Sequence, residues 1–75
     1  MNADVLEKLR KEYPKGTRVK LVQMNDAYAP PVGTLGRVQH VDDTGSIHVK
    51  WNNGSSLAVL YGVDSCVGER VIIFG

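Results

Sequence analysis

Turn-forming residues recur at short intervals along most of this chain, and they divide it into short extended segments. From Gly16 onward these segments are rich in β-branched residues, and several alternate between apolar and polar positions, as strands do. Five strands are predicted, over residues 17–24, 34–41, 46–51, 55–60 and 71–74. They favour a small barrel or sandwich, because closing a sheet removes exposed edges that a chain of 75 residues can hardly leave unpaired.

The connections between the predicted strands differ in length. Residues 25–33 form a long irregular loop, whereas Asn53-Gly54 predicts a tight hairpin turn. A type I′ turn is expected there, with positive φ at both residues. Residues 61–68 are expected to be a connection without regular structure.

The residues before Gly16 follow a helical pattern, and a short helix is predicted over residues 3–13. Asp4 is expected to cap its N-terminus, and Pro14 is expected to end it because the residue before a proline avoids the α region. We expect this helix to cover an open end or a face of the barrel. Its apolar stripe consists of Leu6, Leu9 and Tyr13.

Composition limits the kind of protein that this chain can be. A length of 75 residues predicts a single domain over residues 1–75, with the barrel occupying residues 16–75. Cys66 is the only cysteine, so an internal disulfide and a thiolate zinc site are both excluded. A lone thiol fits a reducing compartment, and we expect a cytoplasmic protein. The N-terminus lacks the apolar segment of a signal peptide, and no membrane association is expected.

Several motifs resemble known proteins. Gly16-Thr17-Arg18-Val19 and residues 33–38 (Gly-Thr-Leu-Gly-Arg-Val) resemble the opening of SH3-like barrels such as the KOW and Mib/Herc2-type modules. The segments Tyr13 to Val19, Met24 to Pro31 and Val41 to Leu57 resemble a small family of unknown function from Gram-positive bacteria, their phages and conjugative elements. The resemblance implies a five-stranded SH3-like barrel and a phage or mobile-element setting, and it transfers no known function.

The loop of residues 25–33 is the leading candidate for contact with a partner, because functional residues concentrate on long loops held by a rigid scaffold. It offers an acidic side chain, a tyrosine and two prolines. In the alternative, structural interpretation, Tyr28 packs beneath the loop and Asp26 caps a turn. The candidate residues are Asn25, Asp26, Tyr28, Pro30 and Pro31.

Trp51 and Asn52 form a second candidate site. An exposed tryptophan beside an amide can stack on a nucleobase or on a proline of a peptide. The alternative is that Trp51 belongs to the core, because it shares a strand face with Ile47 and Val49.

No set of residues matches a catalytic or metal-binding pattern. His40 and His48 lack further donors at a diagnostic spacing, so neither a metal nor another cofactor is expected. Asp42 and Asp43 precede Gly45 and are expected to form an Asx-turn rather than a pair of catalytic carboxylates. The serine hydroxyls have no evident base partner. We therefore expect that the protein is not an enzyme.

Two further groups of residues are candidates for partner contacts. Four cations could share an outer face of the barrel and attract nucleic acid: Arg18, Lys20, Arg37 and Lys50. Three apolar residues lie opposite the predicted inward positions, so either the N-terminal helix or another subunit is expected to cover them, the second as an oligomer interface: Leu60, Ile72 and Phe74.

These observations favour a non-catalytic binding module whose partner is a protein, bound through the loop of residues 25–33. A first alternative is a phage inhibitor of host defence, or a sponge that sequesters a nucleotide signal at a homo-oligomer interface. A second alternative is a nucleic-acid-binding barrel of the KOW type.

Overall fold

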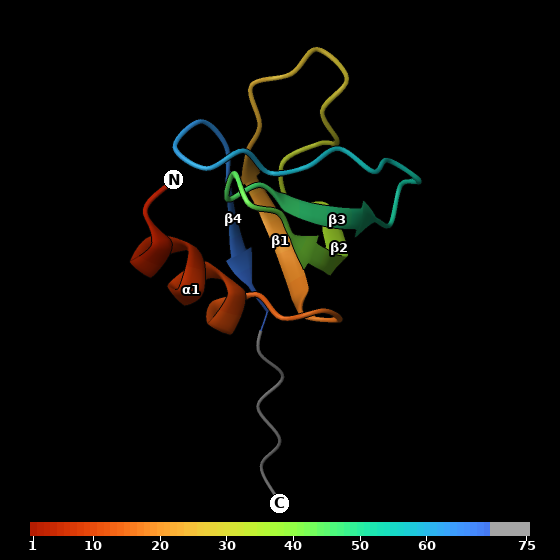
Figure 1. Ribbon diagram of the computed structural model, residues 1–75. Coiled ribbons are helices and arrows are strands. Elements are labelled where there is room, and N and C mark those ends of the chain that lie inside the picture. Colours follow the sequence, from red (N-terminus) through yellow and green to blue (C-terminus); the bar gives the residue numbers. More distant parts are fainter. Residues whose placement is uncertain (70–75) are drawn as a thin grey trace, which may run out of the picture.

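A single antiparallel sheet forms the centre of this computed structural model, which describes residues 1–69 (Figure 1). The strands lie in the order β3-β2-β1-β4, so the first and last strands of the sheet in sequence are neighbours. A short helix precedes the sheet and lies beside it. The elements are α1 (Ala3–Glu12), β1 (Arg18–Gln23), β2 (Leu35–Val41), β3 (Ile47–Trp51) and β4 (Ser65–Gly68).

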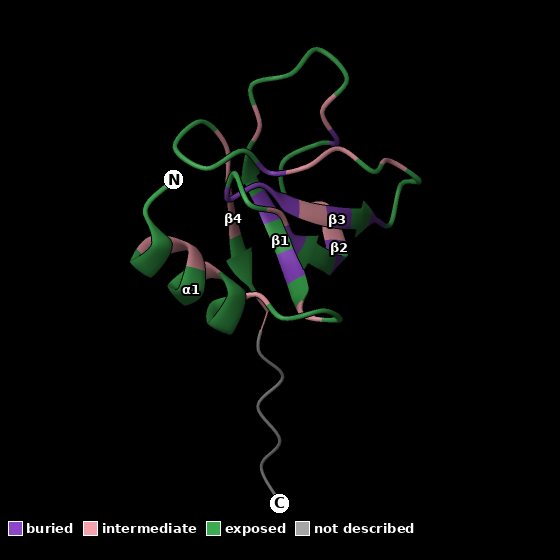
Figure 2. Ribbon diagram, in the orientation of Figure 1, coloured by how far each residue is buried: buried purple, intermediate pink, exposed green. Residues whose placement is uncertain are grey.

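One face of the sheet carries the core, because apolar residues alternate with polar ones along the three longest strands. Trp51 is only 1% exposed, and its indole Nε1 donates a hydrogen bond to the carbonyl of Leu57 at 2.9 Å. The buried apolar core lies within the purple segments of Figure 2 and consists of Val19, Leu21, Val38, Val41, Ile47, Val49, Trp51 and Val59.

The N-terminal helix packs its apolar stripe against this core and ends before Pro14, as predicted. Its N-cap is Asn2 rather than Asp4. The Asn2 side-chain oxygen accepts hydrogen bonds from the N–H groups of Asp4 (2.7 Å) and Val5 (3.4 Å), and Asp4 lies in the first turn. The helix is tied to the end of β2 by Arg10, which donates to the carbonyl of Val41 at 3.3 Å.

The turn between β2 and β3 and the turn after β3 each have a three-residue loop that ends in a glycine with positive φ, Gly45 and Gly54 respectively. In the turn after β3, the N–H of Gly54 bonds to the carbonyl of Trp51 and the N–H of Trp51 bonds to the carbonyl of Ser55. Gly54 has φ +92°, while no non-glycine residue among residues 1–69 has positive φ. The type I′ prediction at Asn53-Gly54 is therefore wrong, and the turn is of the kind that ends in a glycine bulge.

The predicted strand over residues 55–60 is a loop that meets β3 only near its two ends. Val59 pairs with Ile47 as an isolated bridge. Between Ser55 and Val59, the carbonyl of Leu57 accepts a hydrogen bond from the Trp51 indole, and the N–H of Leu57 bonds to the Ser55 hydroxyl (3.3 Å). Both backbone groups of Leu57 are therefore engaged with side chains and not with a neighbouring strand.

The last strand of the described chain begins within the predicted connection. Ser65–Gly68 pairs with β1 and forms the edge strand β4. The predicted strand over residues 71–74 lies outside the described residues. Over residues 1–69 the sheet has four strands and is open, and the mostly-β class and the N-terminal helix are confirmed. Five strands and closure into an SH3-like barrel are not supported by these residues.

Candidate functional site

Three cationic side chains form a straight row across the outer face of the sheet. Arg18 on β1 is paired in register with Arg37 on β2, and Arg37 is paired with Lys50 on β3. All three are exposed, because they alternate along their strands with residues that face the core. We call these three residues the basic row.

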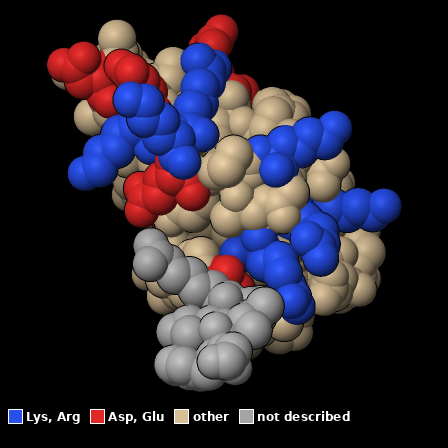
Figure 3. Space-filling model, turned by 90° about the horizontal axis from the view of Figure 1, so that it is seen from below, with Lys and Arg blue, Asp and Glu red and all other residues tan. Residues whose placement is uncertain are grey.

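The basic row is electrostatically unfavourable in the free protein, because like charges directly opposite each other on neighbouring strands destabilise a sheet. Among residues 1–69, no member of the row takes part in a salt bridge. Lys20 lies two residues further along β1 and is partly neutralised by Glu69, at 3.4 Å between Nζ and Oε1. Figure 3 shows lysine and arginine side chains in two regions of this face, one mixed with acidic groups at the upper left and one on the right with few acidic groups among them.

Two surface hollows adjoin the basic row and share Gln39, Lys50 and Gly54 among their lining residues. The first has a volume of about 340 Å³ and is also lined by Arg37 and Asn52. The second has a volume of about 410 Å³, and its other lining side chains include two imidazoles and two hydroxyls, those of His40, His48, Ser55 and Ser56. Both volumes fall within the range of small-molecule sites.

His40 and His48 are stacked across β2 and β3, with ring centroids 4.3 Å apart and ring planes 9° from parallel. A register shift between Val38 and His40 brings His40 directly opposite His48 on the outer face. Nε2 of His48 lies 2.8 Å from Oδ2 of Asp42. The two residues do not form a metal site here: among residues 1–69 no group of three or more histidine, cysteine, aspartate or glutamate side chains could hold a metal ion.

Asp42 is the structural centre of the turn between β2 and β3. Its Oδ1 accepts hydrogen bonds from the Thr44 hydroxyl (2.6 Å) and from the N–H groups of Thr44 and Ser46 (3.0 Å each). The hydrogen bond from Thr44 and then that with His48 hold the pKa of Asp42 well below its usual range. The predicted Asx-turn role of Asp42 is confirmed, and its carboxylate stays ionised and fixes the orientation of His48.

The loop of residues 25–33 projects beyond the end of β1 (Figure 1) and exposes Tyr28 almost completely, with 87% of the residue accessible. Asp26 does cap a turn, because its Oδ1 accepts from the N–H of Tyr28 at 2.7 Å. The N–H of Asn25 bonds to Oδ1 of Asp64 at 2.8 Å, which ties this loop to the 60–64 turn. Pro30 is buried and Pro31 is exposed. The structural interpretation is therefore confirmed for Asp26, which caps a turn. It is wrong for Tyr28, which does not pack beneath the loop but is exposed to solvent.

The other predicted contact residues are divided between the core, the surface and the end of the chain. Trp51 is in the core, which corrects its assignment to a ligand site, whereas Asn52 is exposed beside the basic row. Leu60 is exposed, as are its neighbours Tyr61 and Val63, which the sequence did not single out. Ile72 and Phe74 lie outside the described residues.

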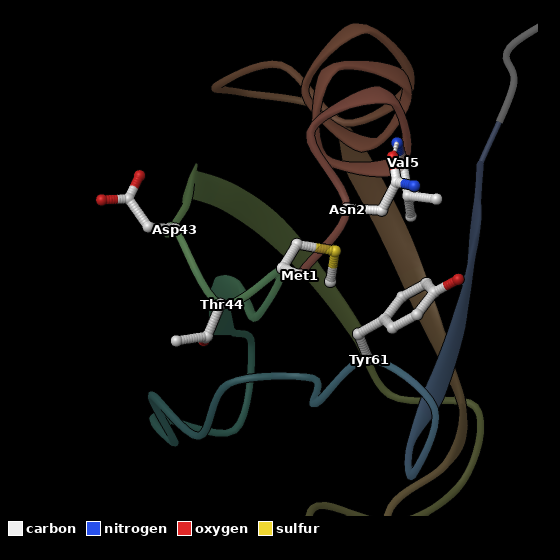
Figure 4. Close-up of a pocket in the computed structure, with 6 residues that line it drawn as sticks. All are labelled: Met1, Asn2, Val5, Asp43, Thr44 and Tyr61. Atoms are coloured by element: carbon white, nitrogen blue, oxygen red, sulfur yellow. Dashed lines mark hydrogen bonds between the residues drawn. The ribbon is translucent and has the colours of Figure 1, made fainter.

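A further hollow of about 530 Å³ lies between the start of α1 and the turn after β2 (Figure 4). Met1 and Val5 form its apolar part, and Tyr61 and Thr44 line it from other segments. Asp43, also at its rim, forms a salt bridge with Arg10 at 2.8 Å. At this rim, Asp43 therefore takes part in docking the helix against the turn after β2.

Cys66 is half-buried beneath the helix. Burial, with a smaller contribution from Glu12, raises the pKa of its thiol to about 11. The group is therefore a protonated thiol at neutral pH and packs against the core as a small apolar side chain.

Among the described residues, the helix is too short and too polar to cross a membrane.

Residues 1–69 thus define a small, mostly-β protein with a short N-terminal helix, an open antiparallel sheet and a basic outer face. Residues 2–68 match the family described as "Domain of unknown function (DUF4314)", and the chain belongs to this family. No curated protein and no solved structure matches the chain.

Proposed function

We propose that this protein is a non-catalytic binding module whose ligand is nucleic acid, held by its phosphates on the basic row. The observation that supports this proposal is the register of Arg18, Arg37 and Lys50, which places three like charges side by side. Neighbouring strands are about 4.8 Å apart, so the row is roughly 10 Å long, which suits two or three successive phosphates. A bound polyanion removes the repulsion that the free sheet carries.

The distribution of charge matters more for this proposal than the net charge. The chain as a whole carries a formal charge of only +1, and most of its acidic residues lie away from the outer face of β1–β3. Asp43 and Glu7 are engaged with Arg10 and Lys11 of the helix. The polyanion is therefore expected to be attracted locally and weakly, with dissociation constants in the micromolar range or above at physiological salt.

Salt dependence is the first expected result. Fluorescence anisotropy with a labelled 12-nucleotide single strand is expected to show binding at 50 mM salt that weakens steeply as salt increases. Two or three phosphate contacts predict a slope of about −1.4 to −2.1 in a plot of log K against log salt for a single strand. An absence of binding at 50 mM salt, or a slope near zero, would contradict the proposal.

A second candidate function is binding of a protein segment through the loop of residues 25–33. Tyr28 supports it, because tyrosine is enriched at binding hot spots and this one is fully presented on a loop that Asp26 and Asp64 hold in place. Val32, on the same loop, is 74% exposed. A pre-ordered apolar tip loses little entropy on binding.

Replacing Tyr28 separates a binding role from a structural one. Tyr28→Ala is expected to change the free energy of unfolding by no more than about 0.5 kcal/mol, because the side chain contacts mainly solvent. Thermal unfolding measures this change. A photo-crosslinking residue at position 28 is expected to capture a partner in cells that the same residue at the helix position of Lys8 does not. Identical products at the two positions, or a large loss of stability, would exclude the loop.

Other parts of the sequence-based interpretation stay predictions. They are the SH3-like closure of the sheet, the phage or mobile-element setting and the cytoplasmic location. The inhibitor or nucleotide-sponge alternative also stays a prediction; it needs an oligomer interface, and two of the three residues predicted for it are outside the described chain.

A further inference from the structure

The hollow of about 410 Å³ beside the basic row has a chemistry that phosphate binding alone does not explain. Two imidazole rings line it, together with the Gln39 amide and the hydroxyls of Ser55 and Ser56. Phosphates need cations and N–H donors, whereas flat aromatic rings beside a mixed set of donors and acceptors suit a nucleobase. We call this site the histidine hollow.

We propose that the histidine hollow is a subsite for an unpaired nucleobase, so that the nucleic acid bound on the basic row is single-stranded. This inference rests on the proposed function and names its ligand more closely. Histidine is among the side chains on which unpaired bases stack, and base stacking of this kind tolerates many sequences because every base has a π-face.

The imidazole platform is ordered before any ligand arrives. Asp42 holds Nε2 of His48 at 2.8 Å, and Asp42 is itself fixed by the hydrogen bonds of Thr44 and Ser46. His40 then lies parallel to the His48 ring at 4.3 Å between centroids. A base that stacks on this pair therefore meets a surface that needs little rearrangement, which favours affinity.

The hollow and the basic row are continuous through Lys50, which belongs to both. A strand whose phosphates follow the row can therefore bring a neighbouring base to the imidazoles. Gln39 lines both hollows and offers an amide to the edge of that base; its Nε2 donates to the carbonyl of Arg37 at 3.3 Å. The bases of a duplex are paired and stacked inside the helix, so a duplex can use the row but not the hollow.

Single strands with equal numbers of phosphates test the subsite, and a duplex, which has two backbones, tests the basic row alone. Anisotropy would be measured with labelled 12-mers of deoxythymidine, of uridine and of an abasic backbone, and with a 12-base-pair duplex. We expect the two base-containing single strands to bind about tenfold more tightly than the abasic strand, from one stacked base. The comparison of deoxythymidine with uridine shows whether DNA or RNA is preferred.

Two substitutions at His40 separate stacking from charge and from folding. His40→Thr places a β-branched residue, which suits a strand, at this exposed position, and the variant is expected to bind all three single strands with the affinity of the abasic one. His40→Phe keeps an aromatic face and is expected to retain the tenfold preference. Thermal unfolding and circular dichroism of both variants check that the sheet is intact.

The outcomes distinguish the subsite from the proposed function on which it rests. If the abasic strand binds as tightly as the base-containing strands, or His40→Thr keeps the preference, the subsite is wrong and phosphate binding on the basic row stands. If none of the four ligands binds in 50 mM salt, both proposals are wrong.

Discussion

Arg37→Glu is expected to weaken nucleic-acid binding strongly without destabilising the free protein. Arg37 is the middle residue of the basic row, with Arg18 on one side and Lys50 on the other. The substitution replaces two repulsive cross-strand pairs with two attractive ones, each worth about 0.2–1 kcal/mol. It also removes the exposed hydrogen bond from Arg37 to the carbonyl of Gly16 at 3.2 Å. The free energy of unfolding should therefore stay the same or rise by up to about 1 kcal/mol.

The effect on binding should be large and of the opposite sign. Reversing one charge removes one phosphate contact and introduces a repulsive one, so an affinity loss on the order of 50-fold is expected, together with a salt slope smaller by about one. Lys8→Glu on the outer side of α1 is the matched control, because it changes the net charge equally away from the row. Comparable losses in the two variants would show that overall charge, not the row, attracts the ligand.

Opposite effects on stability and binding would be the signature of a functional site. Replacing a residue that supports the fold lowers the free energy of unfolding. Replacing a residue that serves ligand binding can leave the free energy of unfolding unchanged or raise it. Denaturant unfolding and anisotropy on the same preparations measure both quantities. A clear loss of stability in Arg37→Glu would mean that Arg37 supports the sheet, and the main argument for the proposed function would be lost.

The positions of β1, β2 and β3 could be predicted from the sequence because alternation fixes which face each side chain takes. Val19 and Leu21 point inward and Arg18 and Lys20 outward simply because the side-chain period of a strand is two. The segment of residues 55–60 has the same alternation but is a loop, because the Trp51 indole takes the carbonyl of Leu57. A competing hydrogen bond from a side chain on another strand cannot be recognised in the sequence of the segment itself.

The basic residues of the candidate site could be predicted as a group but not as a row. Which residues stand opposite each other depends on strand register. The glycine-bulge turn sets that register for β2 and β3 only once its type is known, and β1 is joined to β2 by a long loop that does not fix it. The stacking of His40 on His48 depends on the register shift after Val38, which no residue type announced. Trp51 could have been assigned to the core, since it shares its face with Ile47 and Val49.

Among the glycine-to-alanine substitutions in the strands of this sheet, Gly36→Ala is expected to cause the largest loss of stability. Gly36 lies on the central strand β2, paired with Val19 on one side and Trp51 on the other. A Cβ there would lie 2.6 Å from Cγ1 of Val49, 2.8 Å from Cε3 of Trp51 and 2.9 Å from the carbonyl oxygen of Lys50. The indole cannot move freely, since Nε1 is bonded to Leu57, and the Lys50 oxygen is backbone.

The methyl group must therefore push β3 away from β2, and overpacking of this kind costs about 3 kcal/mol. A domain of this length has a total stability of roughly 4–11 kcal/mol, so the melting temperature should fall by at least about 12 °C. Gly68→Ala on the edge strand β4 is the matched control, because a Cβ there has no neighbour within 4 Å among residues 1–69. It should leave the stability unchanged or raise it by up to about 1 kcal/mol, because alanine restricts the unfolded chain.

Equal melting temperatures for the two variants would show that β2 and β3 do not approach as closely as the packing of Trp51 requires. The same displacement would separate Arg37 from Lys50, so a destabilised Gly36→Ala protein that still folds should also bind nucleic acid less tightly than the Gly68→Ala control.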